Sequence, residues 1–162
     1  MDWVLALLLF LHVAGAILAF GPTYAFLILG PMGAAEPAHR NFSLRFQKSV
    51  SSRLIAPMAL LQGVTGLLLV WRIGFGLLQQ GWLIAGIALY LVVLAIGFGV
   101  LIPALRVLVP ASAAPPPAAA PGEAPSGPPP HIVATIRRAR LGGMANAVLV
   151  LIIVFLMVTK PF

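Results

Sequence analysis

The sequence contains no cysteine and few charged residues. Of its 162 residues, 8% are Asp, Glu, Lys or Arg and 61% are hydrophobic. Soluble globular domains carry about a quarter charged residues, and disordered chains combine low hydrophobicity with high net charge, so both classes are excluded. The lack of cysteine also excludes disulfides, cysteine-ligated zinc sites and iron–sulfur clusters.

Acidic residues are the scarcest charged type. The three carboxylates are Asp2, Glu36 and Glu123, and none lies within a long apolar run. Catalysis by paired carboxylates inside a membrane and a carboxylate proton relay are therefore unsupported. The sequence also lacks a serine–histidine–aspartate set, a phosphate-binding loop and a dinucleotide fingerprint. These absences favour a protein that is not an enzyme.

Four long apolar runs dominate the sequence, at about residues 3–29, 54–71, 82–105 and 141–159, and none contains a charged residue. A run of roughly 20 apolar residues is long enough to cross a bilayer as a helix, the form that satisfies its own backbone in lipid. We therefore predict an all-α bundle of four transmembrane helices, forming one integral membrane domain over residues 1–162. The first run is too long, and its start too poor in positive charge, for a cleaved signal peptide.

The basic residues indicate how the bundle is oriented. Eight of the ten lie between the first and second spans or between the third and fourth, and only Arg72 and Lys160 lie on the other side. Basic segments stay in the cytoplasm, so we predict two cytoplasmic loops and both termini outside. Contact with anionic lipid head groups explains the net charge of +7 without a nucleic-acid partner. The eight residues are Arg40, Arg45, Lys48, Arg53, Arg106, Arg137, Arg138 and Arg140.

The two predicted cytoplasmic loops differ in composition. The segment 110–130 holds nine prolines and seven alanines, which predicts a flexible linker with extended polyproline geometry. In the first loop, Phe42, Phe46 and Val50 recur every four residues. That spacing is typical of an amphipathic extension of the second helix at the interface, and an ordinary basic turn beside the membrane explains it equally well.

His12 is the ionisable side chain deepest in a predicted span. It lies nine residues after Trp3, or about 14 Å along a helix that rises 1.5 Å per residue. An ionisable group at that depth is costly and marks a functional site by default. Gly15 and Ala19 share its helical face, whereas Phe10 and Ile17 lie opposite, so we expect His12 to face the bundle.

Two roles for His12 remain open at this point. It is either a ligand or proton carrier, for a haem or a metal, or a donor of a hydrogen bond between helices. A second axial haem ligand would have to be Met58, Met144 or Met157, because His39 and His131 lie in the predicted loops. We expect an internal polar network around His12 whose other members are Gln62, Thr65, Tyr90 and Asn146. Pro57 and Pro103 are expected near span ends, where a missing backbone hydrogen bond is tolerated.

Three short motifs resemble a known bacterial membrane family, the one called domain of unknown function 2269. They are Leu11-His12 in the first span, Thr65-Gly66-Leu67 in the second, and the ending Leu156-Met157-Val158-Thr159-Lys160-Pro161. The resemblance extends over nearly the whole chain and implies four helices in a bacterial cytoplasmic membrane, without implying an activity. His12 alone gives a looser likeness to HemJ-type protoporphyrinogen oxidases and to the copper-resistance D domain, and the chain lacks the basic residue within a span that the oxidases would have.

The sequence thus predicts a non-catalytic accessory subunit, or a bundle that binds a small ligand, packing with other membrane helices or with copies of itself. The alternative is a redox or porphyrin-handling membrane protein in which His12 binds haem or a metal. A transporter is disfavoured, because no internal repeat and no charge at the centre of a span is evident.

Overall fold

The computed structural model describes residues 2–113 and 127–161, and these form an antiparallel helical bundle with no strand in the part described. Four long helical segments cross the molecule, each long and apolar enough to span a membrane, which confirms the predicted fold class. Most of the proline- and alanine-rich segment, residues 114–126, lies outside the described residues.

Each long segment is built from one or more regular helices. The first is α1 (Trp3–Ala35) and the last is α6 (Pro130–Thr159). The second consists of α2 (Pro37–Val50), the π-helical turn η1 (Ser51–Ile55) and α3 (Ala56–Ile73). The third consists of α4 (Gly81–Ile96), the π-helical turn η3 (Gly97–Leu101) and α5 (Ile102–Ala113), and the short 3-10 turn η2 (Phe75–Gln79) precedes it.

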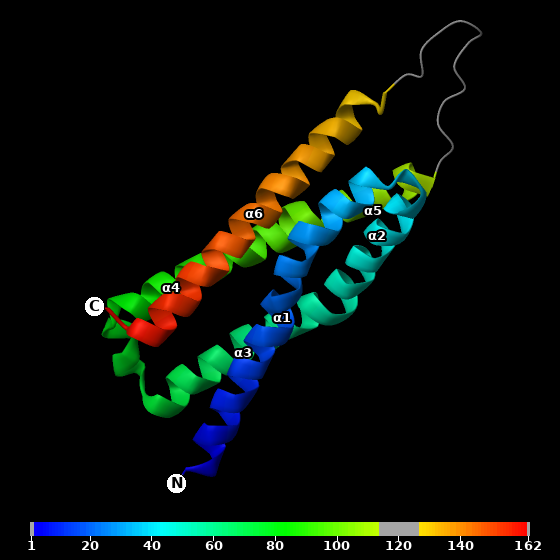
Figure 1. The fold of residues 1–162 in the computed structure, drawn as a ribbon. Coiled ribbons are helices and arrows are strands. Elements are labelled where there is room, and N and C mark those ends of the chain that lie inside the picture. The colour runs from blue at the N-terminus through cyan, green and yellow to red at the C-terminus, as the bar shows by residue number, and fades with distance from the viewer. Residues whose placement is uncertain (1, 114–126, 162) are drawn as a thin grey trace, which may run out of the picture.

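The bundle has two distinct ends. Both termini and η2 lie at one end, which we call the terminal end, and the α1–α2 turn lies at the opposite end, which we call the loop end (Figure 1). At the terminal end α1 packs on α3 and α4 packs on α6, while at the loop end α2 packs against α5. The molecule is therefore two helix pairs, which meet through α2 and α5 at the loop end and also where α1 contacts α6.

The helices are longer at the loop end than the apolar runs predicted. Arg40, Arg45 and Lys48 lie on α2, and His39 and His131 also lie on helices rather than in loops. Of the two interpretations of the 42–50 pattern, a helical extension of the second span is the one observed, and α2 packs on α1 and α5. The apolar runs locate the hydrophobic part of each helix, whereas helix formation continues into polar sequence that still has a packing partner.

Pro57 and Pro103 are the second residues of α3 and α5, close to the ends of the apolar runs as expected, although the helical segment continues past each of them. Each follows a π-helical turn by two residues inside a continuous helical segment. In a regular helix a proline ring collides with the carbonyl group four residues earlier, and a wider turn is one way to relieve that collision. The second long segment bends where η1 joins α3 (Figure 1).

A small apolar cluster closes the terminal end. Val70, Trp82 and Leu83 are buried together, and Met157 packs against them. Met157 occupies the space above Gly86, where an added Cβ would lie 2.5 Å from its Cε. The Lys160 ammonium group sits 5.4 Å from the centroid of the Trp82 ring, within cation–π range. The terminal Met-x-x-Lys-Pro motif therefore fastens α6 to α4.

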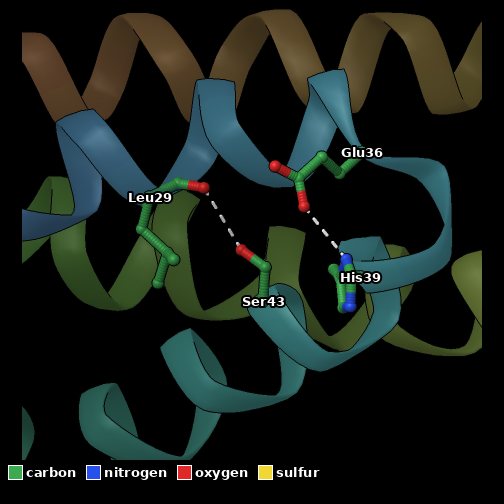
Figure 2. A network of polar contacts seen from close by, with 4 residues as sticks. All are labelled: Leu29, Glu36, His39 and Ser43. Atoms are coloured by element: carbon green, nitrogen blue, oxygen red, sulfur yellow. Dashed lines mark hydrogen bonds and ion pairs between the residues drawn. The ribbon is translucent and has the colours of Figure 1, made fainter.

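The α1–α2 turn depends on one close approach between Gly33 and Ser43. The Ser43 hydroxyl donates to the Leu29 carbonyl oxygen at 3.3 Å, and Glu36 pairs with His39 across the same turn at 3.0 Å (Figure 2). A Cβ on Gly33 would lie 2.7 Å from the Ser43 Oγ and 2.8 Å from its Cβ. Glycine is therefore required at residue 33 for the two helices to pack this closely.

We predict that Gly33→Ala destabilises the fold, because the Ser43 backbone has to move away and such overpacking costs roughly 1–3 kcal/mol. The matched control is Gly30→Ala on the same helix, where an added Cβ meets nothing within 4 Å. The control should be neutral or slightly stabilising, since alanine favours a helix by about 1 kcal/mol over glycine. Thermal unfolding in detergent, followed by circular dichroism, tests the pair, and equal midpoints would contradict the prediction.

The charge distribution also predicts that the loop end faces the cytoplasm. Since the chain has no native cysteine, His131→Cys can report on the loop end and Gln80→Cys on the terminal end. In bacterial spheroplasts, a maleimide that cannot cross the membrane should label Gln80→Cys at once. It should label His131→Cys only after permeabilisation, and the reverse result would show the opposite orientation.

Candidate functional site

His12 projects from α1 toward α3 and contacts two side chains there. Its Nδ1 lies 3.0 Å from the Thr65 Oγ1, and its Nε2 lies 2.9 Å from the Gln62 Nε2. Both partners lie on the same helix three residues apart, so they form one face that receives the ring. The two ring nitrogens are thus both engaged by a single neighbouring helix.

The orientation of the Gln62 amide group decides where the proton of His12 lies. The amide nitrogen faces the ring and donates to the His12 Nε2, which leaves the ring proton on Nδ1, whereas an amide turned by 180° would place the proton on Nε2. Nδ1 then donates to the Thr65 hydroxyl oxygen, and that hydroxyl donates in turn to the Leu61 carbonyl oxygen at 2.8 Å. The chain of donors and acceptors is complete with a neutral imidazole, the form that is least costly to place in lipid.

Two glycines make room for this contact. A Cβ on Gly66 would lie 3.1 Å from the His12 Cε1, and a Cβ on Gly15 would lie 3.1 Å from the Gln62 Oε1. Gly15 and Ala19 are buried, whereas Phe10, Ile17 and Leu18 on the other face are exposed. The inward face of α1 is therefore the one that the pattern of small residues predicts.

One polar atom of the site stays without a partner. The Gln62 Oε1 is buried and makes no hydrogen bond within the described residues, and the same is true of the Asn146 Oδ1. A buried acceptor without a donor costs about 1–3 kcal/mol. These two oxygens are the atoms of the interior that a water molecule or another polar group would stabilise most.

The other predicted polar residues make separate contacts. The Tyr90 hydroxyl donates to the Ala59 carbonyl oxygen at 2.7 Å and lies over Gly63, which joins α4 to α3. The Asn146 Nδ2 donates to the Val93 carbonyl oxygen at 3.5 Å, which joins α6 to α4. His12, Gln62 and Thr65 therefore form one group, while Tyr90 and Asn146 bond to backbone carbonyls elsewhere.

Two polar contacts between helices were not anticipated from the sequence. The Tyr24 hydroxyl on α1 donates to the Ala147 carbonyl oxygen on α6 at 3.0 Å. On α2, the Asn41 Nδ2 donates to the Val109 carbonyl oxygen at 3.1 Å and to the Ser112 Oγ at 2.9 Å. A tyrosine hydroxyl within an apolar run is itself a signal, because it needs an acceptor from another helix.

A haem or metal ligand role would require His12 to change partners. Coordination needs a ring nitrogen with a free lone pair, and the Nε2 lone pair is taken up by Gln62. The described residues contain no group of three or more His, Cys, Asp or Glu side chains able to hold a metal ion. His39 and His131 are exposed at the loop end, and Met157 packs in the apolar cluster at the terminal end.

The basic residues gather at the loop end. Four of the eight are contributed by α2 and η1, one by α5 and three by α6. Arg72, at the terminal end, forms an ion pair with Asp2, which also caps the start of α1. Arg45, Lys48, Arg53 and Arg106 form no ion pair with any described carboxylate, so their charges face the surroundings.

Comparison with known proteins identifies the family of the chain. The family model "Predicted integral membrane protein (DUF2269)" matches residues 6–161. No curated protein and no solved structure matches the chain, so the looser likeness to HemJ-type and copper-resistance D proteins has no support there. The match includes His12, the Thr65-Gly66-Leu67 motif and the terminal Met-x-x-Lys-Pro motif.

We predict that Thr65→Val destabilises the bundle, because the His12 Nδ1–H loses its acceptor within the membrane. Hydrogen bonds between membrane helices contribute about 0.6 kcal/mol on average and up to about 1.7 kcal/mol. The control is Thr135→Val, since that hydroxyl bonds only to the His131 carbonyl oxygen of its own helix. Unfolding free energies in mixed micelles measure both variants.

The same contact has a spectroscopic signature. Nitrogen NMR of the histidine-labelled protein should show the His12 proton on Nδ1 in the wild type. Thr65→Val should change that signal while the signals of His39 and His131 stay unchanged. An unchanged His12 signal together with unchanged stability would show that the two side chains do not interact.

Proposed function

The chain belongs to the DUF2269 family of predicted integral membrane proteins, and from this premise we propose that it is a non-catalytic accessory subunit. It packs its helices against those of a partner membrane protein. It resides in a bacterial cytoplasmic membrane, with both termini outside. The membrane location itself follows from the family and from the four spanning helices.

The observation that supports this proposal is the pair of hydrogen bonds made by the His12 ring. Both ring nitrogens are bonded to α3, so the polar residue with most potential for chemistry is used to hold two helices together. Tyr90 and Tyr24 serve in the same way between other helix pairs. The ring of His12 and the two tyrosine hydroxyls are thus committed to the fold, and we look for the surface that acts on other molecules on the outside of the bundle.

The outer surface offers one region suited to close helix packing. Ala95 and Gly99 lie four residues apart on the third long segment and are exposed, and a Cβ on Gly99 would meet nothing within 4 Å. Glycine costs about 1 kcal/mol in a helix relative to alanine, and the described contacts give no internal reason for it at residue 99. Small residues spaced by four allow another membrane helix to approach.

We predict that the chain purified from its native membrane in mild detergent migrates in a complex larger than the 17.0 kDa monomer. Gly99→Leu should release the partner chain, because the added side chain blocks close approach. Val148→Leu, at an exposed site on the separate helix α6, should retain it. Native mass spectrometry identifies the composition of each complex.

Other outcomes would contradict the accessory role. A monodisperse monomer with a stoichiometric chromophore, whose absorption band disappears in His12→Ala, would establish a redox or porphyrin-binding protein. A complex that contains only copies of this chain would replace the partner subunit with a homo-oligomer.

A further inference from the structure

A shallow basic hollow, open to the surroundings and called the basic cavity below, lies on the flank of the bundle at the loop end. It has a volume of about 290 Å³ and lies where α2 and η1 face α5. Three of its six lining residues are cations, two are serines and one is apolar. They are Arg45, Lys48, Ser49, Ser52, Arg53 and Val109.

The chemistry of this cavity suits an anion with several oxygens. The three cations have no carboxylate partner among the described residues, so their donors are available to a ligand. The Ser49 hydroxyl makes no hydrogen bond in the described structure, whereas the Ser52 hydroxyl donates to the Lys48 carbonyl oxygen at 2.9 Å. Arginine forks pair with phosphate oxygens two at a time, and lysine adds a mobile point charge.

A second cavity adjoins the first and has a different character. It has a volume of about 150 Å³ and shares Lys48 and Ser52 with the basic cavity. Its remaining lining includes Ile102 and Leu105, which provide an apolar wall beside the charged Arg106. A charged cavity that continues into an apolar one has the polarity of a phospholipid, with its phosphate in the first and the start of an acyl chain in the second.

The two cavities also lie at the level of the membrane where a phospholipid changes from polar to apolar. The apolar run of the second segment begins at Leu54, directly after Arg53, and that of the third ends at Leu105, directly before Arg106. The two cavities therefore lie where hydrocarbon gives way to head groups in a bilayer. Anionic head groups attract clusters of Lys and Arg at this level.

The walls of the site are held in place by the fold. The lining residues of α2 and η1 recur every three or four residues and so share one helical face, and those of α5 do the same. Asn41 bonds to the Val109 carbonyl oxygen and to Ser112, one to two turns before the cavity. This contact fixes α2 against α5 next to the lining residue Val109.

We propose that the paired cavities bind one anionic phospholipid, with its phosphate between Arg45, Lys48 and Arg53 and an acyl chain along Ile102 and Leu105. The other basic residues at this end, Arg40, Arg137, Arg138 and Arg140, do not line either cavity. They attract the membrane surface in a general way, whereas the three cavity cations select one lipid. The site does not depend on the lateral partner proposed above.

The test measures lipid binding by the full chain in neutral detergent. Native mass spectrometry with phosphatidylglycerol should show one tightly bound lipid, and the zwitterionic phosphatidylcholine should bind much more weakly. Lys48→Gln combined with Arg53→Gln should reduce phosphatidylglycerol affinity by roughly tenfold or more, since each cation near a head group contributes several-fold. The control, Arg137→Gln with Arg138→Gln, removes the same charge from the same end and should lose less than about threefold.

Two further measurements separate the lipid from a soluble anion. Leu105→Ala should weaken phosphatidylglycerol binding and leave the binding of inorganic phosphate unchanged. Inorganic phosphate at millimolar concentration should not displace the lipid from the wild type. If phosphate displaces it readily and Leu105→Ala has no effect, the site belongs to a soluble anion and the proposal is wrong.

Equal losses in the two double variants would also overturn the proposal, because they would show general surface attraction without a site. Circular dichroism and gel filtration of each variant establish that the fold is intact. Lys48→Arg adds a positive check, because it keeps the charge in the cavity. The affinity of this variant for phosphatidylglycerol should stay within a few-fold of that of the wild type.

Discussion

The structure depends on the fact that lipid offers no hydrogen bonds. A polar side chain within the four apolar runs is therefore stabilised by a partner on the protein, and among the described residues the buried Gln62 Oε1 and Asn146 Oδ1 are the atoms that have none. His12 finds its partners in Thr65 and Gln62, Tyr90 in the Ala59 carbonyl oxygen, and Tyr24 in the Ala147 carbonyl oxygen. Each of these hydrogen bonds joins two different helices. The polar side chains within the spans therefore help to determine which helices are neighbours.

Glycine residues make room for these polar contacts between helices. The helices have to come close enough for polar side chains to reach across, and close approaches of this kind occur at Gly66 beside His12 and at Gly63 beside Tyr90. In lipid, association between helices relies on packing and hydrogen bonds because hydrocarbon neighbours are as apolar as leucine. The Thr65-Gly66 pair combines both elements at one position, since the hydroxyl bonds to the ring of His12 and the glycine makes space for it.

The sequence was sufficient for the spans, their number and the inward face of the first helix, because hydrophobicity and small residues act locally. It also singled out His12, Gln62 and Thr65. It did not separate them from Tyr90 and Asn146, since the choice of acceptor depends on which carbonyl oxygens the packing brings near. It placed His39 and His131 in loops, because polar sequence was equated with the end of a helix. It missed Tyr24 and Asn41 because their partners lie 123 and 68 residues away in the chain.

The π-helical turns could not be read from hydrophobicity at all, yet they affect the loop end most. Pro57 and Pro103 stand at the same distance after η1 and η3, so both central segments adjust their helical register on the way to the loop end. An extra residue in a turn rotates everything beyond it by about 100°, since a regular turn holds 3.6 residues. Relative to uninterrupted helices, the faces that α2 and α5 present are therefore shifted with respect to α3 and α4. The cavity cations of α2 and η1 and the apolar wall of α5 lie within these turns or on their loop-end side. Pro57 and Pro103 therefore stand next to the segments that line the cavities without lining them.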